Sequence, residues 1–249
     1  SKNVPAHIPI VGDARNVLSK LVTEYRAQEA DAARLDEWWQ RIRGWQERYP
    51  LRYDDSTNTE IKPQYMIEAL LEATGGDCIL TTDVGQHQMW AAQYFPFKRP
   101  RQWINSGGLG TMGFGLPAAM GAKVGCPDQV VACISGDGSF QMNIQELATC
   151  AEEEIDVKVF IMNNGYLGMV RQWQELFWDK RYSAVDMGKS PDWVKLAEAF
   201  GATGMRVAAD DEMDDAMREA IATEGPVVLD VRRPDAAGAE GRAAAAEVR

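Results

Sequence analysis

From Ile61 onward, short apolar runs alternate with segments whose apolar residues recur at helical spacing. The runs lie at residues 78–85, 129–139, 157–165 and 226–233, and a further strand is expected near 101–105. Helices are expected at residues 63–74, 116–125, 141–153, 192–201 and 211–225. Apolar strands that alternate with amphipathic helices are typical of a parallel sheet covered on both faces. The pattern therefore predicts an α/β fold with a doubly wound, mostly parallel sheet.

Four regions are expected along the chain. They are the end of an upstream unit, a helical linker, the α/β domain and a flexible tail, at residues 1–25, 26–60, 61–233 and 234–249. The first region contains HIPIVGDARNVLSKL, which indicates a strand, a turn and a helix. Its abrupt start at Ser1 indicates a piece of a longer chain or a processed product. In the linker, aromatic and apolar residues recur at helical spacing, as in a stripe that packs on a neighbouring domain. They are Trp38, Ile42, Trp45 and Tyr49.

Composition and charge exclude several classes of function. The 249 residues carry a formal net charge of -11, which argues against a nucleic-acid surface. No stretch approaches the roughly 20 apolar residues that cross a bilayer, and no signal peptide is visible, so a cytoplasmic protein is expected. The four cysteines show no CxxC spacing and are expected to be buried thiols, while two histidines are too few for a His-rich zinc site.

The strongest chemical signal is the pair GDGS at 136–139 and NN at 163–164. Asp137 and Asn164 each follow an apolar strand, and the right-handed crossover between two parallel strands brings them side by side at the carboxyl ends. A carboxylate and an amide oxygen suit Mg²⁺, which is usually completed by phosphate and water. Gly136 and Gly138 allow close approach of the backbone, and the helix start near Ser139 favours negative charge. The pair therefore indicates a magnesium and diphosphate site rather than a structural turn.

This pair resembles the thiamine-diphosphate signature of the pyruvate decarboxylase and acetolactate synthase superfamily. The resemblance implies that Asp137, Asn164 and the main-chain carbonyl of Tyr166 hold the metal. It extends over residues 4–232.

Two neighbouring segments resemble acetolactate synthases in particular. DVGQHQMWAAQYF at 83–95 is similar to the loop that contacts the diphosphate, which implies roles for Gly85, Gln86 and His87. GGLGTMGFGLPAA at 107–119 is similar to the loop under the cofactor rings, where the main chain of Gly110 faces the aminopyrimidine and Met112 supports the bent cofactor. The alternatives are an ordinary polar loop residue for His87 and plain core packing for Met112.

The segment NNGYLGMVRQWQELFW at 163–178 resembles the part of acetolactate synthases that lies over the thiazolium. The resemblance implies further cofactor contacts from Tyr166, Leu167, Gly168 and Met169. It also implies that Met169, Val170 and Trp173 shape the pocket for the second keto acid. A bulky apolar wall can favour 2-ketobutyrate over pyruvate, because one methylene is worth about 1–3 kcal/mol. The alternative is an ordinary amphipathic helix.

The resemblance as a whole implies the C-terminal catalytic portion of an acetolactate synthase large subunit. Such an enzyme decarboxylates pyruvate and condenses it with a second 2-keto acid in branched-chain amino acid biosynthesis. The implied cofactors are thiamine diphosphate, Mg²⁺ and FAD, the last bound mainly by the central domain whose end residues 1–25 resemble. The implied partners are further copies in a homodimer or tetramer and a small regulatory subunit, in the cytoplasm or, in a photosynthetic eukaryote, in the plastid.

Two departures from the family leave alternatives open. No segment resembles the pyrimidine-binding domain that supplies the family's catalytic Glu, so that domain must come from a longer parent chain or a partner. After Arg233 the sequence does not match the arm that usually closes the active site. Another thiamine-diphosphate carboligase, decarboxylase or oxidase and a catalytically silent module are the alternatives. A Rossmann module is disfavoured, because GGLGTMGFG has no acidic residue about 20 positions later that closes a strand.

Overall fold

The computed structural model describes residues 3–28, 32–54, 61–188 and 190–232. The chain divides between Leu51 and Arg52 into two compact units. The predicted tail at 234–249 and residues 55–60 of the predicted linker lie outside the described residues. Among the described residues, no helix combines the length and apolar character that crossing a membrane requires.

The first unit is helical. It contains α1 (Ala14–Ala27), a 3₁₀ turn (Ala32–Leu35) and α2 (Asp36–Arg48). Asp13 is the N-cap of α1. Its side chain accepts a hydrogen bond from the Asn16 N–H at 3.0 Å, a common arrangement at helix starts. The strand expected before this helix is wrong: residues 7–12 form no strand, and Ile8 is 82% exposed. A strand needs a neighbour to pair its backbone groups, and the described part of this unit provides none.

The predicted stripe on the linker is seen on α2. The Trp38 and Trp45 rings meet edge to face with centroids 5.7 Å apart, and the Arg41 guanidinium lies over Trp38. No residue of α1 or α2 is buried. The helix is therefore confirmed, while its assignment to a separate linker region stays a prediction.

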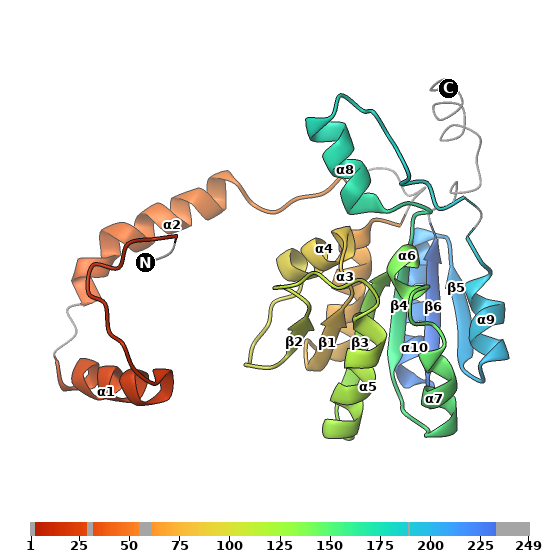
Figure 1. Ribbon diagram of the computed structural model, residues 1–249, viewed down its shortest axis with the longest axis horizontal. Coiled ribbons are helices and arrows are strands. Elements are labelled where there is room, and N and C mark those ends of the chain that lie inside the picture. Colours follow the sequence, from red (N-terminus) through yellow and green to blue (C-terminus); the bar gives the residue numbers. More distant parts are fainter. Residues whose placement is uncertain (1–2, 29–31, 55–60, 189, 233–249) are drawn as a thin grey trace. The chain divides into compact units, whose positions relative to one another are not determined.

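The second unit is built on a six-stranded, all-parallel sheet in the order β2-β1-β3-β4-β6-β5 (Figure 1). The strands are β1 (Cys78–Thr82), β2 (Trp103–Asn105), β3 (Val130–Gly136), β4 (Lys158–Asn163), β5 (Thr203–Val207) and β6 (Val227–Arg232). The residues of the four inner strands β1, β3, β4 and β6 are almost all buried, as expected for strands covered on both faces, whereas the edge strands β2 and β5 are partly exposed. The predicted fold class is confirmed.

Helices cover both faces of this sheet. One face packs against α3 (Pro63–Thr74), α4 (Gln86–Tyr94) and α10 (Met213–Ala222), and the other against α5 (Gly115–Gly125), α7 (Glu146–Glu152) and α9 (Trp193–Ala199). A 3₁₀ turn (Asp210–Glu212) precedes α10, and α6 (Asp137–Phe140) and α8 (Gly168–Phe177) follow β3 and β4 at the upper edge of the sheet in Figure 1. Successive strand residues contribute to opposite cores: Leu80 and Ile134 to the first, Ile79 and Cys133 to the second.

Three details differ from the prediction. The single helix expected at 141–153 is wrong, because the chain forms α6 and α7 with turns between them. Asn143 lies in these turns and donates from its side chain to the Gly113 carbonyl at 2.6 Å, which draws the segment toward the glycine-rich loop. Strand β5 was not expected, since an exposed edge strand with Gly204 and Arg206 has no continuous apolar run. Three cysteines are buried thiols as expected, but Cys126 is exposed.

Candidate functional site

The carboxyl ends of β1, β3 and β4 meet at one edge of the sheet. Thr82 pairs with Ile134, and Gly136 pairs with Met162, so Asp137 and Asn164 leave neighbouring strands at similar height. The chain runs from β1 to β2 on one side and returns to β3 on the other. Such a reversal of strand order opens a crevice, and open α/β sheets bind their ligands there.

A cavity of about 170 Å³ lies at this edge. Every residue predicted to bind the cofactor lines it, as does Val170, predicted to shape the acceptor pocket. Its lining consists of Val84, Gly85, Gln86, His87, Trp90, Gly110, Met112, Gly136, Asp137, Gly138, Ser139, Met162, Asn164, Tyr166, Leu167, Gly168, Met169 and Val170. Trp173 does not line it and is 56% exposed on α8. Four segments that are far apart in the sequence therefore converge on one space.

Asp137 lies at the start of α6 and is 2% exposed. Its Oδ2 accepts hydrogen bonds from the Gly165 N–H at 3.0 Å and from the Ser190 hydroxyl at 3.4 Å. Burial raises the pKa of Asp137 to about 6, although main-chain hydrogen bonds from Gly138 and Gly165 act in the opposite direction. A cation bound beside this carboxylate would favour its ionised form.

Asn164 and Tyr166 form the turn that follows β4. The Asn164 Oδ1 accepts from the Tyr166 N–H at 2.9 Å, which leaves the second lone pair of this oxygen for another partner. The Arg171 guanidinium lies over the Tyr166 ring, 4.2 Å from its centroid. The described residues contain no cluster of three or more His, Cys, Asp or Glu that could hold a metal. One carboxylate with amide and carbonyl oxygens instead fits a hard cation whose remaining ligands come from phosphate and water.

His87 is buried in α4 with its Nε2 toward no hydrogen-bonding partner among the described residues. Burial lowers the pKa of His87 to about 4, and a hydrogen bond to the Asp83 main chain only partly offsets this. The ring is therefore neutral near pH 7. A buried polar atom without a partner usually has an explanation, and a ligand in the adjacent cavity would provide one.

Glycines allow side chains of the cavity to pack directly against the backbone. A Cβ at Gly85 would lie 2.6 Å from His87 Cε1, and one at Gly138 would lie 2.8 Å from Leu167 Cδ2. A Cβ at Gly168 would overlap the Gln86 side chain. Larger residues at these positions would displace side chains that line the cavity, so the glycines preserve its shape.

Asp83 anchors the glycine-rich loop. Its Oδ1 accepts from the Val84 N–H at 3.0 Å and the Gly113 N–H at 2.7 Å, and its Oδ2 accepts from the Gly115 N–H at 3.2 Å. The side chain is 1% exposed. This carboxylate fixes the loop that carries Gly110 and Met112. Sequence reasoning missed this role, although an acid directly after a buried strand is a signal for it.

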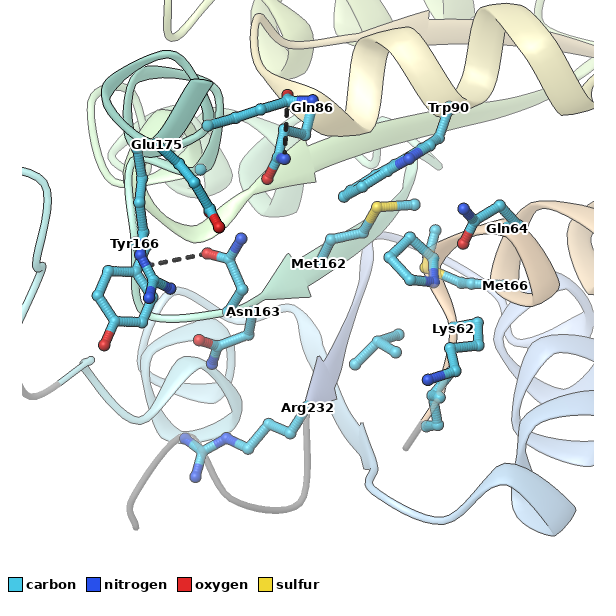
Figure 2. A pocket seen from close by; sticks show the side chains of 17 residues that line it. Lys62, Gln64, Met66, Gln86, Trp90, Met162, Asn163, Tyr166, Glu175 and Arg232 are labelled. Atoms are coloured by element: carbon cyan, nitrogen blue, oxygen red, sulfur yellow. Dashed lines mark hydrogen bonds between the residues drawn. The ribbon is translucent and has the colours of Figure 1, made fainter. Parts of the chain in front are cut away.

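A larger cavity of about 460 Å³ adjoins the first and was not predicted (Figure 2). The two share Gln86, Trp90, Met162, Asn164, Tyr166 and Gly168. The charged residues in its lining are Lys62, Arg171, Glu175 and Arg232. A hydrogen bond from Gln86 Nε2 to Gln172 Oε1 at 3.2 Å links α4 to α8 beside it.

Comparison with known proteins gives this site a family. The family model described as "Thiamine pyrophosphate enzyme, C-terminal TPP binding domain" matches residues 83–231, which include every segment that lines the smaller cavity. The chain belongs to the thiamine pyrophosphate enzymes. Thiamine pyrophosphate is thiamine diphosphate, so the resemblance found in the motifs is confirmed at the level of the family.

Relatives within this family are acetolactate synthases. The chain is 52% identical over 224 residues to the acetolactate synthase isozyme 3 large subunit of Escherichia coli K12. It is 48% identical over 235 residues to an acetolactate synthase of Mycobacterium bovis and 46% identical over 233 residues to the acetolactate synthase large subunit of Haemophilus influenzae. These matches cover 89%, 92% and 92% of this chain but 39%, 38% and 40% of the relatives. The chain thus spans about two fifths of the length of these relatives.

Proposed function

We propose that this chain is the thiamine-diphosphate- and Mg²⁺-binding portion of an acetolactate synthase large subunit. The observation that carries the proposal is the cavity at the ends of β1, β3 and β4, in which all the predicted cofactor-binding residues meet. The identity of about half of all residues to acetolactate synthases supports this choice over other carboligases, decarboxylases and oxidases of the family.

In this proposal, Asp137, Asn164 and the Tyr166 carbonyl hold Mg²⁺. The main chain at 136–139 and 85–87 and the His87 side chain hold the diphosphate. The loop with Gly110 and Met112 supports the rings, and residues 167–169 cover them. Thiamine diphosphate, when bound, supplies the chemistry that decarboxylates a 2-keto acid and transfers the remaining fragment. The protein contributes the anion site, the orientation and the exclusion of water.

Met169, Val170 and Trp173 are proposed to face the second keto acid, which is pyruvate or 2-ketobutyrate. Val170 is 46% exposed and Trp173 is 56% exposed on the outer part of α8. Apolar side chains with this exposure leave room for a substrate or for another part of the enzyme to complete the pocket.

The remaining features belong to the whole enzyme. FAD is proposed to bind mainly to the central domain, of which residues 1–25 are the end. The pyrimidine-binding domain is proposed to come from a longer parent chain, within a homodimer or tetramer in the cytoplasm. The words "large subunit" in the names of two relatives support a small regulatory partner.

Isothermal titration with thiamine diphosphate, with and without Mg²⁺, tests the binding proposal. Asp137→Asn should abolish the Mg²⁺-dependent part of binding, because it removes the charged metal ligand. Asp128→Asn is the matched control, since Asp128 is exposed in the turn before β3, at the opposite end of that strand from Asp137. Binding that does not depend on Mg²⁺ or on Asp137 would contradict the proposal.

Product analysis tests the activity. This chain, supplied with the upstream half, should form acetolactate from pyruvate, and acetohydroxybutyrate when 2-ketobutyrate is added. Tartronate semialdehyde, acetaldehyde or acetyl phosphate as the main product would indicate another member of the family. No product despite cofactor binding would favour a catalytically silent module.

A further inference from the structure

Asp230 is a buried carboxylate on β6, one strand in from the β5 edge of the sheet. It lies on β6 with 0% exposure, where an ionised group needs compensation. Its Oδ2 accepts from Arg206 Nε at 3.1 Å and from Arg232 Nε at 2.9 Å, and its Oδ1 accepts from Asn163 Nδ2 at 2.8 Å. Three donors therefore fix both oxygens of this carboxylate.

Asp230 in turn fixes the orientation of Asn163. An ionised carboxylate only accepts hydrogen bonds, so it selects the amide nitrogen of Asn163 and turns the amide oxygen to the opposite side. That oxygen, Oδ1, lies 3.3 Å from the Ser190 hydroxyl. Asn163 is 4% exposed, and its side chain also lines the larger cavity.

Ser190 links this arrangement to Asp137. Its hydroxyl lies 3.4 Å from Asp137 Oδ2 and has a single proton for the two acceptors, Asn163 and Asp137. The hydroxyl is thus held between an amide oxygen with a fixed orientation and the carboxylate proposed to bind Mg²⁺. A continuous polar chain runs from β6 through the end of β4 to the start of α6.

We infer that Asp230, Asn163 and Ser190 are positioning residues that hold the Asp137 carboxylate in the orientation needed for a divalent cation. The inference rests on the proposed function, because it takes Asp137 as a metal ligand. None of the three lines the smaller cavity, so they act through Asp137. Groups that orient a metal ligand commonly change metal affinity by about 10- to 100-fold when they are removed.

The test measures divalent-cation affinity in the 249-residue chain with thiamine diphosphate in excess. Mn²⁺ serves as the probe, and free Mn²⁺ is followed by electron paramagnetic resonance. Ser190→Ala and Asp230→Asn should each weaken Mn²⁺ binding by about tenfold. The first removes the hydroxyl between Asn163 and Asp137, and the second removes the charge that orients Asn163. Ser190→Thr keeps the hydroxyl and should restore the wild-type affinity.

Asp192→Asn is the matched control for Asp230→Asn. Asp192 pairs with the same Arg206 at 2.6 Å, but its side chain is more than a third exposed and it contacts the guanidinium rather than Asn163 or Asp137. Its affinity for Mn²⁺ should stay within about twofold of the wild type. Thermal unfolding of each variant without ligands separates a loss of fold from a loss of positioning, and Ser190→Ala keeps the test valid if Asp230→Asn does not fold.

Three results would overturn the inference. Wild-type Mn²⁺ affinity in Ser190→Ala and in folded Asp230→Asn would show that Asp137 needs no positioning, while the proposed function would stand. Equal losses in Ser190→Ala and Ser190→Thr would show that the hydroxyl is not the active group. Absence of Mn²⁺ binding in the wild type would overturn both the inference and the proposed function.

Discussion

His87 and Asp137 face the same cavity and respond to burial in opposite directions. Burial lowers the pKa of His87 to about 4 and raises that of Asp137 to about 6, because it favours the neutral form of each group. Near pH 7 His87 is therefore uncharged, whereas the Asp137 carboxylate is mostly ionised but poorly stabilised. A ligand that carries a cation can stabilise the Asp137 carboxylate, and a polar group of the same ligand can pair with His87 Nε2.

The burial of His87 should make folding stability depend on pH. Its pKa is near 6.5 in the unfolded chain and about 4 in the folded chain, so between these values only the unfolded chain binds the proton. Its contribution to stability is therefore complete above about pH 6.5 and is lost as the pH falls toward 4. Between about pH 7.5 and pH 5, the wild type should lose about 2 kcal/mol more unfolding free energy than His87→Asn.

Urea unfolding of both proteins at the two pH values measures this difference. The comparison with His87→Asn is needed because the raised pKa of Asp137 contributes with the opposite sign in part of the same range. Equal pH dependence in the two proteins would show that His87 is not buried as a neutral ring.

Asp83→Asn should destabilise the second unit by about 3 kcal/mol, because an amide cannot accept all the hydrogen bonds that the buried carboxylate accepts. Asp77→Asn is the matched control before the same strand, since its Arg99 ion pair is exposed, and it should change stability by less than about 1 kcal/mol. Chemical denaturation measures both. Similar losses in the two variants would contradict the anchoring role of Asp83.

At the level of residues, the sequence predicted the side chains that line the cavity better than the residues that hold them in position. GDGS and NN stand directly after apolar strands, and strand order then brings them together. Ser190 and Asp230 gave no such local signal, because each acts through partners about 30 to 70 positions away. Contacts of that range depend on sheet order, which one sequence does not reveal.

At the level of elements, long apolar patterns were decisive and short ones were not. The buried strands β1, β3, β4 and β6 were all predicted, since each is an apolar run. Strand β5 was missed because it lies at the edge of the sheet, where it is partly exposed and has no apolar run. It is held there by packing against α9. The helix expected at 141–153 is divided because the side chain of Asn143 binds a distant carbonyl instead of continuing one regular helix.

The close packing of β5 against α9 gives a prediction for Gly204→Ala. The added Cβ would lie 2.5 Å from the Val194 carbonyl oxygen and 2.9 Å from its Cα, so main chain would have to move. The substitution should cost about 2 kcal/mol or more of unfolding free energy. Gly121→Ala is the control in α5, where no atom lies within 4 Å of the new Cβ, and it should stabilise the chain by up to about 1 kcal/mol.

Urea denaturation and the emission of Trp193, which packs in the same core, measure the effect. A fully stable Gly204→Ala variant would mean that α9 does not approach β5 as closely as the structure shows.

At the level of the whole molecule, the second unit has two closed cores and a formed site, while the first unit buries no residue of its two helices. The chain also spans about two fifths of the length of its acetolactate synthase relatives. This chain is therefore expected to bind the cofactor without converting pyruvate.

The chain alone should bind thiamine diphosphate weakly and should not turn over pyruvate. The reason is that no segment resembles the family's pyrimidine-binding domain with its catalytic Glu. A colorimetric acetoin assay, run with and without the upstream half in the presence of Mg²⁺ and FAD, measures this. Robust acetolactate formation by the 249-residue chain on its own would refute the expectation.

Because the tryptophans differ in exposure, their intrinsic fluorescence can report on binding to the site. Trp193 is 1% exposed and should emit at short wavelength whatever the state of the site, whereas Trp173 and Trp178 on and beside α8 are more than half exposed and should be open to aqueous quenchers. Trp90 lines both cavities and senses whatever displaces water from them. Acrylamide quenching can thus distinguish a molecule that settles over α8 from one that enters beneath it, without any added dye.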